Sequence, residues 1–410
     1  MKITFDKDLL IEAVGMAMSA VSNKNTIAAI EGILFTTDDN ANCTLSSYDL
    51  EKGFRKTVEA DVQEQGSWII NAGKLSRMIR TMTGDITITV NDRGTAKIKS
   101  GKSEFSTAAI AGEEFPAMPE LTGEQSFILS GKDLRGAVNQ VFHAVGNNDQ
   151  MPELTGAFFD VKGNTLKLVG CDRNRLAIRE KEITPKTTTE DEFDLSFIIP
   201  GRTLSELMKI APDDYSDVEI VYVRRHVIFM FDDNIFFSRL IDKAYIDYEK
   251  VIPTNYKIEV TVDRAELIKS LERATLITED KSLGMAIGYV KCEFTENGLV
   301  VSSNSTTSSM FDELAADKEG DDITIGFNCR FLLDALKAAT GEVVKLTMQT
   351  PSTSMLITPV EDATPPTDAE DGDPTEPETS TETPETAPQK EEIQEKFLYM
   401  VFPVRMKEGV

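Results

Sequence analysis

The feature that most constrains the fold of this 410-residue chain is an internal repeat that occurs three times. Each copy opens with a short strand pattern that leads directly into a helix with one apolar face. The opening strands are Ile3–Asp6, Phe127–Ser130 and Val260–Asp263. Asp6, Ser130 and Asp263 stand where a helix N-cap belongs, because their side chains can accept a hydrogen bond from the first helical turn.

The three helices that follow carry apolar residues three and four positions apart, which is typical of a helix that buries one face. The residues expected to be buried are Leu10, Ala13, Val14, Ala17, Met18 and Val21 in the first copy, Leu134, Ala137, Val138, Val141, Phe142 and Val145 in the second, and Leu267, Ser270, Leu271 and Ala274 in the third.

A second unit recurs later in each copy, where an apolar strand leads into another helix and then into segments of alternating polarity. These segments are typical of antiparallel hairpins, such as Ile86–Val90 followed by the turn at 91–94. We therefore expect an α+β protein of three repeated domains, each with two helices packed on antiparallel sheets of about eight short strands. The expected domains are residues 1–123, 124–253 and 254–410.

Residue types that carry catalysis are scarce, and no enzyme is expected. The sequence has two histidines, four scattered cysteines and no phosphate-binding, zinc-protease or serine-hydrolase motif, so neither a metal nor a cofactor is expected. Asp232 and Asp233 could serve as an acid–base pair, but their place between two apolar strands favours a turn. With reduced cysteines, no apolar stretch of membrane-spanning length and no secretory signal, we expect a cytoplasmic protein.

One segment departs from the repeat. Residues Glu361–Glu392 hold twelve acidic residues and one basic residue, Lys390. Such a composition cannot bury enough apolar surface to form a core, so we expect a disordered insertion in a hairpin loop. It is either a plain solvated spacer or a charged segment that keeps DNA or unsuitable proteins off one face of the molecule.

The net charge of −26 at first argues against a nucleic-acid partner. The six repeat helices nevertheless carry a small excess of basic residues. Six helices of about 10 Å diameter could enclose only a narrow hole, whereas twelve would leave roughly 28 Å, enough for duplex DNA. Two chains closed head to tail could therefore encircle DNA, and a ring held by topology needs few phosphate contacts.

Several segments along the chain resemble those of the bacterial DNA polymerase III β-subunit family. The segment Gly170–Ala177 is similar to the family's Thr-Asp-Gly-His-Arg-Leu-Ala motif, and Asp242–Pro253 is similar to its interdomain linker. Phe327-Asn328 and Tyr399–Met406 resemble two further strands of the family. Only the acidic insertion lies outside this resemblance.

The resemblance implies a DNA sliding clamp, a crescent-shaped monomer that pairs into a ring. It would be the non-catalytic processivity subunit of a DNA-directed DNA polymerase (nucleotidyltransferase) holoenzyme in the bacterial cytoplasm. The family also implies a hydrophobic cleft between the second and third domains for short peptides of the Gln-Leu-x-Leu-Phe sort, carried by the replicative polymerase, the clamp loader and repair proteins. The cleft residues implied here are Leu154, Thr155, Cys171, Arg175, Leu176, Ile246, Val251, Ser352, Ser354, Met400, Val401, Pro403, Val404, Arg405 and Met406.

DNA without sequence preference would lie against the inner helices. The candidate DNA-binding residues are Lys24, Lys74, Arg77, Arg80, Lys132, Asn148 and Arg202. The sequence departs from the family at Arg173-Asn174, where a Gly-His pair is usual, at Ile246, where proline is usual, and at Pro152-Glu153, where two tyrosines are usual. Residues Lys407–Val410 extend beyond the usual end. The competing hypothesis is an acidic three-repeat protein–protein scaffold that does not bind nucleic acid.

Overall fold

The structure is a computed structural model that describes residues 1–22, 27–37, 42–120, 123, 125–148, 150–187, 193–278, 289–305, 307–360 and 396–406. Lys24, the acidic insertion and the extension Lys407–Val410 lie outside the described residues. The chain divides into two compact units, Met1–Pro253 and Thr254–Val410, and each is described by itself.

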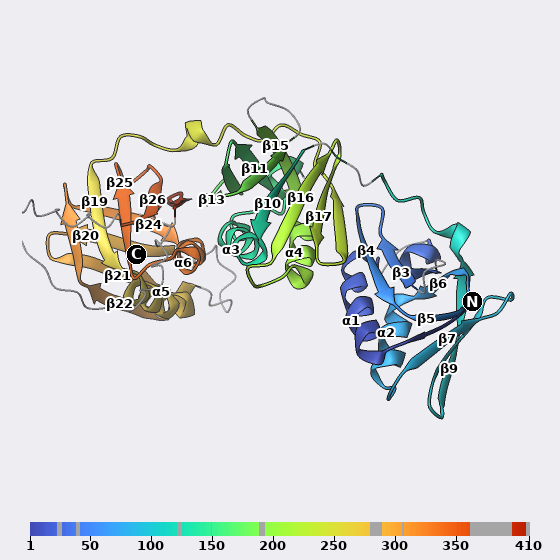
Figure 1. Cartoon of the computed structure of the whole chain (residues 1–410). Helices are drawn as coiled ribbons and strands as arrows, with labels where there is room; N and C mark the ends of the chain where they lie inside the picture. Colours follow the sequence, from blue (N-terminus) through green and yellow to red (C-terminus); the bar gives the residue numbers. More distant parts are fainter. Residues whose placement is uncertain are drawn as a thin grey trace, which may run out of the picture. The chain divides into compact units, whose positions relative to one another are not determined.

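The three sequence copies fold into the same order of elements, which confirms the repeat (Figure 1). The first copy consists of β1 (Lys2–Phe5), α1 (Lys7–Ala17), β2 (Gly32–Thr37), β3 (Asn42–Tyr48), β4 (Lys52–Glu59), β5 (Asp61–Glu64), β6 (Ser67–Asn71), α2 (Ala72–Arg80), β7 (Ile86–Val90), β8 (Thr95–Ser100) and β9 (Ser103–Ala111).

The second copy completes the first unit. It consists of β10 (Gln125–Ser130), α3 (Gly131–Phe142), β11 (Gly156–Lys162), β12 (Thr165–Cys171), β13 (Arg175–Glu182), β14 (Thr184–Thr187), β15 (Asp194–Pro200), α4 (Gly201–Ile210), β16 (Asp217–Val223), β17 (His226–Phe231) and β18 (Asn234–Arg239).

The third copy forms the second unit. It consists of β19 (Ile258–Asp263), α5 (Arg264–Thr278), β20 (Tyr289–Thr295), β21 (Gly298–Asn304), β22 (Ser309–Leu314), β23 (Ala316–Glu319), β24 (Ile323–Asn328), α6 (Cys329–Ala338), β25 (Val343–Met348), β26 (Met355–Pro359) and β27 (Phe397–Val401). Within this unit the strands form two runs, β27-β26-β25-β19-β23 and β22-β21-β20-β24.

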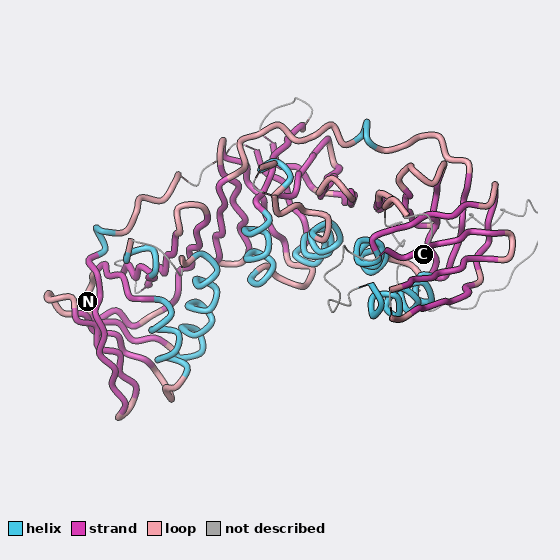
Figure 2. Tube along the Cα trace, turned by 180° about the vertical axis from the view of Figure 1, so that it is seen from behind, coloured by secondary structure: helices cyan, strands magenta, loops and turns pink. Residues whose placement is uncertain are grey.

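In each copy the two helices lie side by side and pack on antiparallel strands (Figure 2). The three expected N-caps are confirmed, because Asp6, Ser130 and Asp263 each accept a hydrogen bond from a backbone N–H of the first helical turn. Most residues of the helix stripes are also buried, although Met18 and Val145 are only half-buried. Phe142 is 38% exposed, because eight residues after Leu134 it lies at the edge of the apolar stripe.

The first two copies are joined into one continuous sheet. Strand β18 of the second copy pairs antiparallel with β4 of the first, with Phe236 opposite Phe54 and Phe237 opposite Gly53. The backbone N–H of Arg239 extends this pairing by donating to the carbonyl of Glu51 at 2.7 Å. The sheet of fourteen strands that results spans both copies of the first unit.

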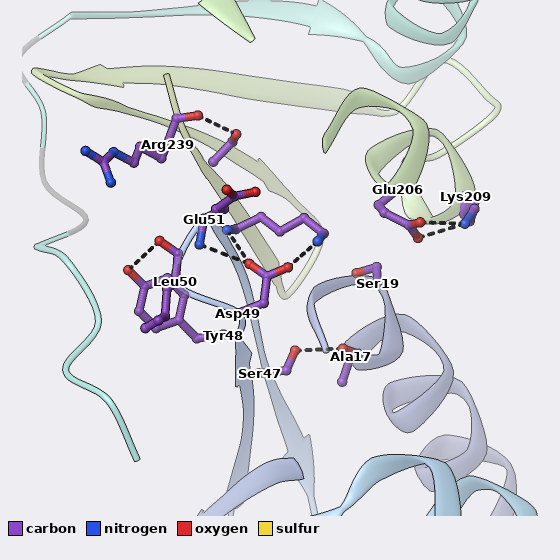
Figure 3. Close-up of polar contacts among 12 residues, drawn as sticks. Ala17, Ser19, Ser47, Tyr48, Asp49, Leu50, Glu51, Glu206, Lys209 and Arg239 are labelled. Atoms are coloured by element: carbon purple, nitrogen blue, oxygen red, sulfur yellow. Dashed lines mark hydrogen bonds and ion pairs between the residues drawn. The ribbon is translucent and has the colours of Figure 1, made fainter. Parts of the chain in front are cut away.

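Polar contacts stabilise the β3–β4 hairpin at the joint between the two copies, where β4 pairs with β18 (Figure 3). The Asp49 carboxylate accepts from the backbone N–H of Glu51 at 3.0 Å and of Lys52 at 2.8 Å, and it also pairs with the Lys52 ammonium. Just before the turn, the buried Ser47 hydroxyl donates to the carbonyl of Ala17 at the end of α1, at 2.7 Å. The β3–β4 hairpin is therefore bonded to the end of α1 in the first copy as well as to β18 in the second copy.

Candidate functional site

The most basic helix of the repeat is α2. Its apolar residues Ala72, Leu75 and Ile79 are buried, and the helix is capped by Asn71, whose side chain accepts from the Lys74 N–H at 3.0 Å. The exposed face carries Lys74, Arg77 and Arg80. These three residues form no ion pair with a carboxylate in the part of the chain that the structure describes. The helix therefore presents three cations to solvent without local neutralisation.

Most basic residues on the other helices have a local partner. Lys209 pairs with Glu206 at 2.8 Å and Lys337 with Glu272 at 2.7 Å. Arg135 donates to the Ala211 carbonyl at 2.7 Å, just beyond the end of α4, so this cation has a structural role. Fewer basic side chains on the helices are therefore available to bind a ligand than the sequence count suggests. Most of the available ones lie on α2.

The remaining predicted DNA-binding residues differ in their surroundings. Arg202, at the start of α4, is exposed. The Lys132 ammonium lies 2.8 Å from the Tyr215 hydroxyl, a contact that raises the pKa of the lysine and leaves it charged. Asn148 is exposed after α3, but its side-chain oxygen accepts from the Gln150 N–H and so helps to form the loop. Lys24 lies outside the described residues.

Five of the predicted peptide-binding residues of the first unit lie at the β12–β13 turn or on the loop at 151–155 that the turn contacts. Leu154, Cys171 and Leu176 are buried, and Cys171 lies directly opposite Leu176 in the two strands. Burial also raises the pKa of the Cys171 thiol, which keeps it protonated and weakly reactive. Thr155 follows Leu154, and its hydroxyl donates to the Pro152 carbonyl at 2.8 Å. Leu154, Cys171 and Leu176 thus contribute buried apolar side chains to this part of the first unit.

The turn between the two strands is tightly organised. The Asp172 carboxylate pairs with the Arg175 guanidinium at 2.8 Å and accepts from the backbone N–H of Asn174 at 3.0 Å. Arg175 is therefore neutralised and partly buried at this position. Arg173 adopts a φ of 77°, in the left-handed region that favours glycine.

The linker segment after β18 packs against β11. The Tyr245 ring stacks on Phe158 with centroids 4.7 Å apart, and burial, followed by the nearby Cys171, raises the pKa of the Tyr245 phenol. The Tyr248 hydroxyl donates to the Asp160 carboxylate at 2.8 Å. These contacts place Ile246, half-buried, beside a cavity of about 620 Å³. Val251 is 42% exposed.

In the second unit, the predicted peptide-binding residues lie on β27 and on the segments around it. Met400, Val401 and Ser354 are buried, whereas Ser352 and Arg405 are exposed. The chain after β27 turns back along β24, where Pro403 pairs with Phe327 and the Val404 N–H donates to the Gly326 carbonyl at 2.8 Å. Met406 packs over Gly326, which has no side chain to displace it.

Two strand edges that the sequence did not single out are also exposed. Among the strands that the structure describes, residues 103–108 of β9 pair only with β8, and β22 is the last strand of its run. Each edge carries an exposed aromatic residue, Phe105 at 38% and Phe311 at 63%. The sequence feature that could have indicated these edges is a phenylalanine at a strand position that faces solvent.

The structure also locates the residues considered for other functions. Asp232 and Asp233 form the turn between β17 and β18, as the sequence predicted, and Asp232 has a φ of 47°. All four cysteines are buried. No helix in the described ranges is both long and apolar enough to span a membrane.

Comparison with known proteins gives matches along most of the chain. Family models of the DNA polymerase III beta subunit match the N-terminal domain over residues 1–119, the central domain over 128–247 and the C-terminal domain over 249–367. The beta sliding clamp of Bacillus subtilis is 29% identical over 357 residues, which cover 84% of this chain and 92% of that protein. The beta sliding clamp of a Staphylococcus aureus strain is 26% identical over 356 residues, with the same shares covered.

The fold agrees with these matches. The crystal structure of the DNA polymerase sliding clamp from Bacillus subtilis superposes with a TM-score of 0.85 at 24% identity, covering 99% of this chain and 100% of that chain. Three clamp domains of helices on antiparallel sheets are thus present, and the acidic scaffold hypothesis loses its support. The chain belongs to the DNA polymerase III beta subunit family, the bacterial beta sliding clamps.

Proposed function

We propose that two copies of this chain close head to tail into a ring around duplex DNA and tether the replicative DNA polymerase to its template. In this role the protein is a non-catalytic processivity subunit of the polymerase holoenzyme, whose nucleotidyl transfer takes place on another subunit. The three clamp domains are proposed to be residues 1–123, 124–253 and 254–410. The place of action is the bacterial cytoplasm, where the chromosome is copied.

The single observation that carries the ring proposal is the pair of exposed strand edges. One edge, on β9, belongs to the first unit, and the other, on β22, belongs to the second. A strand edge presents unpaired backbone groups that can hydrogen-bond to a second strand. Because the two edges are on different units, pairing β9 of one chain with β22 of another is a head-to-tail contact, and two such contacts would close the proposed ring. Phe105 and Phe311 would add buried apolar area to that interface.

Retention of DNA in this proposal depends on enclosure rather than on tight contact. The three exposed cations of α2, together with Arg202 and Lys132, supply weak attraction to phosphates. Weak, sequence-independent contacts allow the ring to slide. A net charge of −26 is compatible with this role, because acidic surfaces facing away from DNA do not oppose enclosure strongly at physiological salt.

Partner proteins are proposed to bind through short extended peptides with apolar side chains, as in polymerases, clamp loaders and repair proteins. The two sets of candidate residues, around the β12–β13 turn and around β27, supply buried apolar bases with polar residues at their edges. Met400 and Met406 add adaptable side chains, which suit a site that accepts several partners.

Two measurements test the proposal. Light scattering should give a molar mass near twice 45.3 kDa, whereas a stable monomer at micromolar concentration would contradict ring formation. A fluorescent Gln-Leu-Ser-Leu-Phe peptide should bind in a polarisation assay, and Met406→Ala with removal of Lys407–Val410 should weaken binding while the dimer persists. Unchanged peptide affinity in that variant would contradict the assignment of the β27 set.

A further inference from the structure

The β12–β13 turn carries a basic side chain in an unusual backbone conformation. Arg173 lies at a φ of 77°, where a residue with a Cβ is disfavoured, and it is exposed. Two hydrogen bonds hold the turn in this form, from the Asn174 N–H and the Arg175 guanidinium to the Asp172 carboxylate. The conformation is therefore imposed by the turn, and the Arg173 side chain projects from a fixed point.

The two arginines of the turn differ in charge balance. Arg175 pairs with Asp172 at 2.8 Å, so its charge is matched locally. Arg173 instead places its Nε 2.7 Å from the thioether sulfur of Met151, a neutral and weak acceptor. Among the described residues, Arg173 forms no ion pair with a carboxylate. Its positive charge is thus available to a ligand.

The position of Arg173 connects this charge to the predicted peptide-binding residues. Arg173 lies in the turn that joins Cys171 to Leu176, and both of these residues are buried. Met151, which the arginine contacts, precedes Leu154 in the same short loop, and the Leu154 N–H donates to the Met151 carbonyl at 3.0 Å. A peptide bound over the surface above Leu154, Cys171 and Leu176 would therefore lie near the Arg173 guanidinium.

We propose that Arg173 makes this clamp select peptides that carry a carboxylate next to their apolar residues. The inference rests on the proposed peptide-binding function and adds a specificity-determining residue to it. An acidic side chain on the peptide would replace the weak Met151 contact with a charge-assisted pair, in which the guanidinium donates to the carboxylate. A basic side chain at the same place would be repelled.

The test compares peptides of the form Gln-Leu-x-Leu-Phe-x, in which aspartate, serine or lysine stands at one x position and serine at the other. Polarisation binding to the intact protein should rank aspartate above serine and serine above lysine, with about two- to fivefold between neighbours, as expected for a partly exposed ion pair. Arg173→Gly should remove most of this ranking, and Arg173→Glu should reverse it. Raising the salt concentration should compress the ranking in the original protein.

Arg93 supplies a control, because it is also an exposed arginine in a hairpin turn of the same unit, between β7 and β8. Arg93→Gly and Arg93→Glu should leave the peptide ranking unchanged. The proposal is overturned if Arg173→Glu still binds the aspartate peptide better than the lysine peptide, or if the Arg93 variants alter the ranking equally. Failure of every peptide to bind the original protein would instead overturn the underlying peptide-binding function.

Discussion

The ring of Phe237 on β18 occupies the space where a side chain on Gly53 of β4 would begin, so any other residue at position 53 would force this ring to move. The Tyr48 ring also packs against Phe237, tilted by 44° and with ring centroids 5.5 Å apart. Val221 and Ile228 complete the buried cluster. The first two clamp domains are thus joined by apolar packing as well as by a shared sheet.

Gly53→Ala should therefore destabilise the first unit by about 1–3 kcal/mol, the usual cost of forcing extra volume into a packed core. Thermal unfolding followed by circular dichroism would measure the shift. Gly15→Ala is the matched control, because a Cβ there meets nothing within 4 Å in the interior of α1, and alanine should stabilise the helix by about 0.5–1 kcal/mol. Equal shifts for both variants would contradict the role of the Phe237 contact.

His226 begins β17 beside the same joint and faces Arg239 across the β17–β18 pair. Burial, and then the Arg239 charge, hold the pKa of this histidine below its ordinary value of 6.5. The folded state therefore favours the neutral ring, which contributes stability above pH 6.5 that is lost as the pH falls through the lower folded pKa. The melting-temperature advantage of the original protein over His226→Gln should shrink between pH 7.5 and pH 5. An advantage that is independent of pH would contradict this assignment.

Phe311→Asp should convert the dimer to a monomer, because it places a charge in the exposed β22 edge that is proposed to pair with β9 of a second chain. Light scattering over a dilution series would show the fall in molar mass. Tyr215→Asp is the control, since Tyr215 is also 63% exposed but lies in a loop of the second domain. A Phe311→Asp protein that stays dimeric at low micromolar concentration would argue against this interface.

Replacing Lys74, Arg77 and Arg80 together by glutamine should weaken DNA binding at low salt and flatten its salt dependence. Each lost phosphate contact reduces the slope of log K against log salt by about 0.9. Polarisation with a labelled duplex would give the slope. Lys209→Gln should have little effect, because Glu206 already neutralises that lysine. An unaltered slope in the triple variant would mean that α2 does not face DNA.

Much of the fold could be predicted because local patterns determine it. Helix stripes such as Leu10 to Ala17, N-caps such as Ser130, and the hairpin at 86–100 each depend on neighbouring residues in the chain. Phe142 was wrongly expected to be buried, because eight residues after Leu134 it lies at the edge of the apolar stripe rather than at its centre. The joint between Gly53 and Phe237 could not be predicted, since it depends on residues far apart in sequence.

The candidate site was less predictable, for a similar reason. The sequence identified α2 as basic, but it could not show that Arg135 and Lys337 are engaged by Ala211 and Glu272. Nor could it show the left-handed conformation of Arg173, which depends on the Asp172 turn. The edges at Phe105 and Phe311 became visible only once strand neighbours were known.

The most direct test of the account is whether DNA retention depends on topology. The protein, loaded onto nicked circular DNA by a compatible clamp loader, should remain bound through gel filtration and should be lost when the same DNA is cut to linear form. The Phe311→Asp variant should not be retained on either form. Equal retention on circular and linear DNA by the original protein would contradict enclosure, the central claim of the proposed function.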